Sequence, residues 1–135
     1  MNQSDQYGTT PLHIACAEGH ERIVKILLKN GRGVIDVNQR EKNGETPLWI
    51  ACSQGREQIV KILLSSGKDI DVKKKAIVYF YGRKFTAAEI ARKNGCPKIA
   101  DLVDEYEGKP EEVRLRLGKG KDSIPFLFLL FFIPS

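Results

Sequence analysis

The chain has 135 residues, of which 41% are hydrophobic, so it is long enough for one domain with a buried core and too short for two full-sized domains. Its 22 Lys and Arg residues against 17 Asp and Glu residues give a formal net charge of +5, which permits an acidic partner without requiring one. This composition excludes a wholly disordered chain.

The three cysteines and the apolar segments indicate the cellular compartment of the protein. The cysteines form neither an even disulfide framework nor a metal-binding pair, which favours a reducing compartment. The first residues lack the basic and apolar segments of a secretory signal. The longest apolar run, 126–133, would cover about 12 Å as a helix, whereas a bilayer core needs about 30 Å. We therefore expect no transmembrane helix and a cytoplasmic location, with the nucleus as the alternative.

A repeated sequence is the most informative feature of the chain. Thr-Pro-Leu-His-Ile-Ala at 10–15 returns as Thr-Pro-Leu-Trp-Ile-Ala at 46–51 and, weakened, as Thr-Ala-Ala-Glu-Ile-Ala at 86–91. The hexad Ile-Val-Lys-Ile-Leu-Leu occurs identically at 23–28 and 59–64, and a weakened third copy lies at 99–104. A fixed order of motifs at nearly constant spacing predicts three similar structural units.

Each unit is predicted to contain two short helices. In the first unit, the Thr10 hydroxyl can cap a helix that starts with Pro11, and Gly19 can adopt the left-handed conformation that ends it. A second helix follows from Glu21, with one broad apolar face. The same pattern predicts helices over 11–18, 21–29, 47–54, 57–65, 87–94 and 97–106.

The connections between units differ from each other. Asn43-Gly44 favours positive φ angles and predicts a projecting loop or a short β-hairpin. The next connection, 73–82, has basic and aromatic residues in place of this polar turn, so the turn signal for a hairpin is missing there.

The first unit resembles the ankyrin repeat, whose pattern includes Thr-Pro-Leu-His-x-Ala. The second unit has Trp49 in place of the histidine, and the third unit resembles a terminal repeat. The resemblance covers 5–106 and implies an all-α ankyrin-repeat solenoid of three helix-turn-helix units joined by β-hairpin-like loops. We expect the array to occupy 1–106, with units at about 5–37, 41–72 and 81–106, and a non-repeat tail at 107–135.

Several conspicuous side chains are interpreted as structural. The resemblance implies that His13 forms hydrogen bonds between neighbouring units, and no oriented nucleophile or base accompanies it. Trp49 is interpreted as packing between units, with partner contact as the alternative. Packing is also favoured for Cys16 and Cys52, and for Cys96, whose thiol could instead be activated at a helix start. We therefore expect no enzymatic activity, no metal and no cofactor.

The resemblance implies a non-catalytic protein–protein interaction module that binds through loop tips and the concave face of the first helices. Among the implied contacts we favour Tyr7, Glu18, Lys42 and Gln54. The full set of candidate partner-binding residues is Gln6, Tyr7, Thr9, Ala17, Glu18, Lys42, Asn43, Glu45, Ser53, Gln54, Lys93 and Asn94.

Alternative functions remain open at the level of sequence. The basic segment 73–84 and the apolar tail 122–135 could serve a membrane-surface or nucleic-acid associated adaptor. Uncapped ends of the array could lead to self-association. A short amphipathic helix is expected at 111–117, docked against the last unit. A small-molecule substrate is not expected, and the short array is expected to be part of a larger protein.

Overall fold

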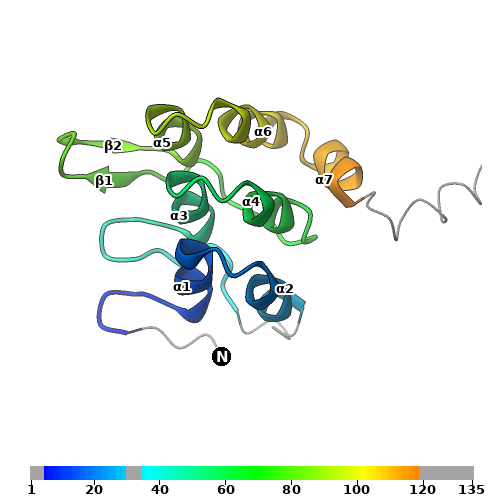
Figure 1. Ribbon diagram of the computed structural model, residues 1–135, viewed down its shortest axis with the longest axis horizontal. Coiled ribbons are helices and arrows are strands. Elements are labelled where there is room, and N and C mark those ends of the chain that lie inside the picture. The colour runs from blue at the N-terminus through cyan, green and yellow to red at the C-terminus, as the bar shows by residue number, and fades with distance from the viewer. Residues whose placement is uncertain (1–4, 30–34, 119–135) are drawn as a thin grey trace, which may run out of the picture.

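Three helix pairs stack in the order of the sequence. The computed structural model describes residues 5–29 and 35–118. The pairs are α1 (Pro11–Glu18) with α2 (Glu21–Lys29), α3 (Pro47–Ser53) with α4 (Glu57–Leu64), and α5 (Ala87–Lys93) with α6 (Pro97–Gly108). In Figure 1 the first helices α1, α3 and α5 form one column, and the second helices α2, α4 and α6 form another beside it. The predicted three-unit, all-α solenoid is confirmed.

The same local signal starts the first helix of every unit. The hydroxyls of Thr10, Thr46 and Thr86 each accept a hydrogen bond from the backbone N–H three residues later. These bonds satisfy an N–H that has no partner within the helix. The predicted helix ends agree with the structure to within two residues, as expected for ends that fray.

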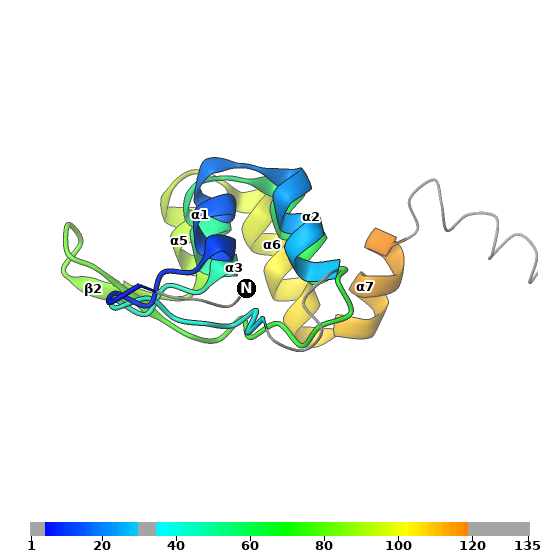
Figure 2. The ribbon, with the colours of Figure 1, turned by 90° about the horizontal axis from the view of Figure 1, so that it is seen from below.

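Only the connection without a turn signal forms paired strands among the described residues. Strands β1 (Ala76–Val78) and β2 (Arg83–Phe85) are antiparallel, with Ala76 opposite Phe85 and Val78 opposite Arg83. Ala76 and Phe85 are buried, so the base of the hairpin is held by the core, and Gly82 supplies a positive φ at the turn. In Figures 1 and 2 this hairpin projects farther from the helices than the other loops.

Backbone hydrogen bonds join the loops of neighbouring units. The Lys42 N–H donates to the Tyr7 carbonyl at 2.7 Å, and the Ile77 N–H donates to the Asn43 carbonyl at 3.0 Å. A Cβ atom on Gly44 would lie 2.7 Å from the Lys75 carbonyl oxygen, so only glycine permits this approach. One continuous layer of loops therefore runs beside the first helices.

The hydrophobic core is shared between units. Cys16 and Cys52 occupy equivalent places in α1 and α3 and are completely buried. The identical hexads show how neighbouring elements increase burial. Ile23 in the first unit is 47% exposed, whereas the equivalent Ile59 in the second unit is 1% exposed. Each unit thus covers apolar surface on the unit that follows it.

A seventh helix covers the outer side of the second helices. Helix α7 (Pro110–Gly118) contacts α6 and α4, and its Val113 side chain is completely buried. The Arg116 guanidinium donates two hydrogen bonds of 2.6 Å to the Glu105 carboxylate. The short helix predicted at 111–117 is therefore present and docked. The apolar segment 122–135 lies outside the described residues, and within the described ones no helix is long and apolar enough to cross a bilayer.

Candidate functional site

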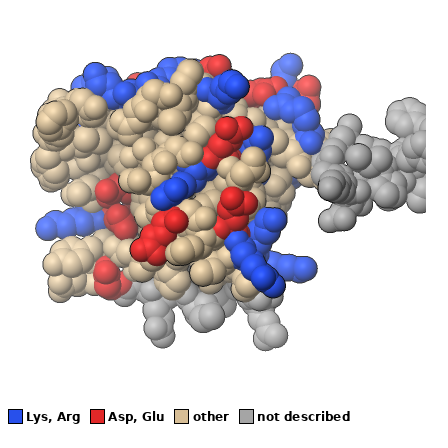
Figure 3. Space-filling view, viewed as in Figure 1, with Lys and Arg blue, Asp and Glu red and all other residues tan. Residues whose placement is uncertain are grey.

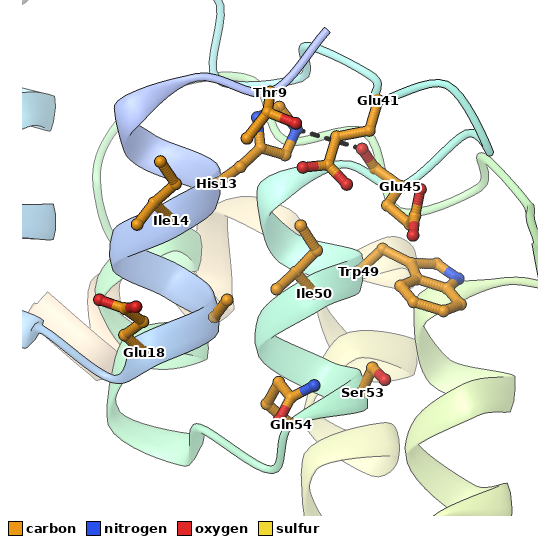
Figure 4. A pocket seen from close by; sticks show the side chains of 11 residues that line it. Thr9, His13, Ile14, Glu18, Glu41, Glu45, Trp49, Ile50, Ser53 and Gln54 are labelled. Carbon is orange, nitrogen blue, oxygen red and sulfur yellow. Dashed lines mark hydrogen bonds between the residues drawn. The ribbon is translucent and has the colours of Figure 1, made fainter. Parts of the chain in front are cut away.

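An open groove runs between α1 and α3 on the side of the first helices. It encloses about 420 Å³. Ile50 projects from α3 toward α1, Ile14 lies over α1 itself, and Trp49 extends from the side of α3 that faces away from α1 (Figure 4). The residues that line this inner groove are Thr9, His13, Ile14, Ala17, Glu18, Glu41, Glu45, Trp49, Ile50, Ser53 and Gln54.

Inter-unit hydrogen bonds fix one end of the inner groove. The Thr10 N–H donates to His13 Nδ1 at 3.0 Å, so this nitrogen is an acceptor and the ring hydrogen lies on Nε2. His13 Nε2–H then donates to the carbonyls of Gln39 at 2.8 Å and Glu45 at 3.1 Å. Both ring nitrogens are therefore engaged: Nδ1 within the first unit, and Nε2 in the bonds that join two units, as the resemblance implies.

The second unit makes the same connection with a different side chain. Trp49 Nε1–H donates to the Phe85 carbonyl at 2.9 Å, and the indole is buried. Phe85 precedes Thr86 just as Glu45 precedes Thr46, so Trp49 takes the place of the histidine in the repeat. The interpretation of Trp49 as inter-unit packing is confirmed, although one edge of the ring also lines the groove.

Hydrogen bonds at the other end of the first helices set their spacing. The Arg56 guanidinium donates to the Ala17 carbonyl at 2.9 and 3.3 Å. In the next unit the Asn94 side chain donates to the Ser53 carbonyl at 2.9 Å. These bonds satisfy carbonyls at the ends of α1 and α3 and hold the helices at a constant separation.

The charged residues that line the groove are acidic. Glu18, Glu41 and Glu45 are among the lining residues, and no Lys or Arg is. Burial raises the pKa of the Glu45 carboxyl above its usual range, and the neighbouring Glu41 raises it further. The nearby Lys42 ammonium lies 5.8 Å from the centre of the Tyr7 ring. Across the surrounding face, basic and acidic side chains are interspersed (Figure 3).

The predicted partner-binding residues fall into three places. Gln6, Tyr7, Lys42 and Asn43 lie at the turns of the first two loops. Lys93 and Asn94 lie at the end of α5, outside the inner groove; the Lys93 ammonium is 4.8 Å from the Tyr81 ring centre. The remaining six line the groove, namely Thr9, Ala17, Glu18, Glu45, Ser53 and Gln54.

Sequence reasoning missed the apolar floor and one carboxylate of the groove. Ile14 and Ile50 were not among the candidates, although they occupy the same position of the repeat and both line the groove. Glu41 was also missed, and it directly precedes the predicted contact Lys42. Comparison of equivalent positions in the first two units could have identified the isoleucines.

The cysteines are positioned for packing rather than chemistry. Burial raises the pKa of the Cys16 thiol to about 12 and also raises that of Cys52, so both thiols stay protonated at neutral pH. Cys96 immediately precedes α6 and is half-buried. Within the described residues, no cluster of three His, Cys, Asp or Glu side chains could hold a metal ion.

A second exposed feature is the tip of the β1–β2 hairpin. Tyr79 is 76% exposed and Phe80 is 89% exposed. The flanking basic residues are also exposed: Lys73, Lys74, Lys75, Arg83 and Lys84. The tip therefore offers aromatic and cationic groups together.

Comparison with known proteins agrees with this architecture. The family described as "Ankyrin repeats (3 copies)" matches residues 1–74, which is more than half of the chain. The protein belongs to the ankyrin repeat family. Ankyrin repeats generally mediate protein–protein interaction, and the family is generally non-catalytic.

One similar protein is the human Transient receptor potential cation channel subfamily A member 1. It is 48% identical over 31 residues, which correspond to 23% of this chain and 3% of the channel subunit. The chain therefore matches only a small part of that relative.

Proposed function

We propose that this protein is a cytoplasmic adaptor or scaffold that binds another protein through its loop tips and inner groove, without catalysing a reaction. The observation that carries the proposal is the open groove between α1 and α3. It combines an apolar floor with polar and acidic side chains at its edge, as protein interfaces do.

The shape of the array favours binding over catalysis. A stable protein interface needs about 800 Å² on each partner, and a stack of three units with projecting loops supplies an extended surface of that order. Enzymatic catalysis instead needs a nucleophile or base oriented by a further group. In the groove, the imidazole of His13 uses both nitrogens for structural hydrogen bonds.

Four exposed side chains are expected to contribute most to partner binding. Tyr7 and Lys42 lie at neighbouring loop turns, and Glu18 and Gln54 lie at the ends of the first helices. They therefore surround the groove at two ends. Aromatic and charged side chains at such positions can anchor a partner and exclude water around it.

The proposal is tested by replacing Tyr7, Glu18, Lys42 and Gln54 with alanine and measuring the recovery of bound proteins in a pull-down. Circular dichroism first checks that the helices persist. A matched control replaces Glu21, Arg22, Gln58 and Lys98, which are exposed on the second helices. We expect loss of specific partners with the first variant only. Equal recovery with both variants would show that another face binds.

The exposed hairpin tip favours a second candidate function. We propose, as the alternative, that Phe80 and its basic neighbours attach the protein to an acidic membrane surface or to nucleic acid. Exposed aromatic rings can enter a lipid interface or stack on bases, while nearby lysines are attracted to phosphates. The apolar tail could add to membrane contact.

Salt dependence and removal of the tip residues test this alternative. The chain is applied to immobilised heparin and to anionic vesicles, alongside a variant with Tyr79, Phe80, Lys74 and Lys75 replaced by alanine. Retention on heparin should weaken steeply with salt because counterions are released on binding. If retention changes neither with salt nor with these substitutions, the hairpin tip is not the binding element.

A further inference from the structure

We propose that the inner groove binds a protein segment that carries an arginine or lysine next to an apolar side chain. This inference rests on the proposed function, because it names the chemistry of the partner that the groove receives. The cationic end of the segment would lie against Glu41 and Glu45, and its apolar neighbour would cover Ile14 and Ile50.

The apolar part of the groove is open on one side. Ile14 is 50% exposed, whereas the equivalent Ile50 is 9% exposed because α1 lies beside it. The apolar strip of the groove consists of Ile14 on α1 and of Ile50 and Trp49 on α3 (Figure 4). An aliphatic side chain from a partner could cover this strip and remove it from water.

The carboxylates lie at one end of this strip. In Figure 4, Glu41 and Glu45 extend from the loop that crosses the upper end of α1 and α3, with Glu41 nearer His13 and Glu45 on the side of Trp49. The charge of Glu41 raises the pKa of the Glu45 carboxyl, so the two groups act on each other. Neither residue takes part in a salt bridge within the described part of the chain. Two neighbouring negative charges beside a partly buried apolar surface attract a cation more strongly than a fully solvated carboxylate does.

Two basic side chains close to the groove, Lys42 and Arg56, are engaged elsewhere. Lys42 lies over the Tyr7 ring, and the Arg56 fork is bound to the Ala17 carbonyl. No Lys or Arg is among the residues that line the groove. A cationic side chain from a partner would therefore complement the charge of the groove. The long aliphatic stem of arginine or lysine also suits the apolar strip that leads to the carboxylates.

The test uses two tripeptides that differ in charge and hardly in shape. Acetylated and amidated Leu-Arg-Leu is titrated into the isotopically labelled full chain to about 10 mM, enough for a millimolar affinity. The matched peptide replaces arginine by neutral citrulline. We expect saturable NMR shifts at the Trp49 indole N–H and at the methyl groups of Ile14 and Ile50. The citrulline peptide should bind about five- to tenfold more weakly, as for a partly desolvated charge pair.

Two protein variants locate the charge that is responsible. Glu41→Gln with Glu45→Gln should reduce the affinity for the arginine peptide to that for the citrulline peptide. The control, Glu21→Gln with Glu107→Gln, alters exposed carboxylates on α2 and α6 and should leave the affinity unchanged. Equal binding of the two peptides, no saturable shift at the groove, or no effect of the Glu41 and Glu45 substitutions would overturn the inference.

Failure of this inference can be distinguished from failure of the proposed function. If the arginine peptide does not bind but the pull-down still depends on the four residues around the groove, the partner has a different chemistry and the proposed function stands. If neither peptide binding nor partner recovery in the pull-down depends on the groove, both proposals are wrong. An acidic or neutral peptide that binds better than the arginine peptide also contradicts the inference.

Discussion

A ring N–H connects each of the first helices α1 and α3 to the loop of the next unit. His13 and Trp49 occupy the same position of the repeat, yet they make this bond with an imidazole and an indole. The feature that the two units share is thus a ring N–H that donates to a backbone carbonyl of the next unit. A residue with no such N–H would leave the carbonyl without its partner.

The first prediction concerns the substitution Trp49→Phe. An aromatic ring remains, but the Phe85 carbonyl loses its donor, so the free energy of unfolding should fall by about 1–3 kcal/mol. Urea unfolding followed by circular dichroism measures the change. Tyr79→Phe, which removes a hydroxyl from a highly exposed ring, should change stability little. Equal effects of the two substitutions would contradict the role assigned to the indole N–H.

The second prediction concerns the dependence of stability on pH. Because the pKa of Glu45 is raised in the folded protein, folding is favoured when this group is protonated. Its unfavourable contribution grows as pH rises from its ordinary pKa of about 4.5 through the higher folded value. Glu45→Gln should therefore raise the urea midpoint at neutral pH, with the gain shrinking toward pH 3.

Glu89 provides a comparison of opposite sign. Its pKa is lowered, chiefly by the hydrogen bond that its carboxylate accepts from the Thr86 N–H, so its ionised form stabilises the fold. That stability is present above the ordinary pKa and is lost as pH falls through the lowered folded value. Glu89→Gln should therefore lower the urea midpoint at neutral pH. A change of the same sign for both variants would contradict the assigned environments.

At the scale of the helix, identical sequences are stabilised differently by their neighbours. The hexad Ile-Val-Lys-Ile-Leu-Leu forms most of α2 and α4. Its first isoleucine is half exposed in α2 and fully buried in α4. Because the local sequence is the same, the difference in burial comes from the neighbouring helices, and α4 contacts α2, α6 and α7.

The third prediction uses this internal control. Ile59→Ala should lower the free energy of unfolding by about 2–5 kcal/mol, since it leaves a cavity in the core. Ile23→Ala removes the same atoms from a half-exposed site and should cost about 1 kcal/mol or less. Urea unfolding of both variants measures the two values. Equal losses would contradict the arrangement in which each unit covers the next.

The sequence predicts the helices well and the site only in part. Threonine caps, helix-ending glycines and repeated apolar hexads are local signals, and they locate all six repeat helices. The β1–β2 hairpin has no polar turn signal in the sequence. It is stabilised at its base by the burial of Ala76 and Phe85, which a turn motif does not reveal. The groove arises between units, so the exposure of Ile14 depends on contacts that no local pattern contains. The predicted domain boundaries remain predictions.

At the scale of the whole molecule, the three units share one core. The first helices contact each other along one column, and α7 joins α4 and α6 along the other. A unit that separated from its neighbours would expose apolar side chains such as Ile59 to water. Stability is therefore a property of the stack.

The fourth prediction is that the described array unfolds in one cooperative transition. Trp49 fluorescence reports on the central unit, whereas far-ultraviolet circular dichroism reports on all helices. Because the units cover each other, the urea transitions measured by the two probes should coincide. Separate transitions would show that the units are stable independently of each other.

Docking of partners between α1 and α3 can be tested with a photo-crosslinking amino acid placed at Gln54 or at Gln58. Both are exposed glutamines, but Gln54 lines the inner groove and Gln58 lies on the second helix α4. We predict that irradiation with partner proteins crosslinks the Gln54 variant and leaves the Gln58 variant uncrosslinked. Crosslinks from Gln58 that equal or exceed those from Gln54 would contradict the account.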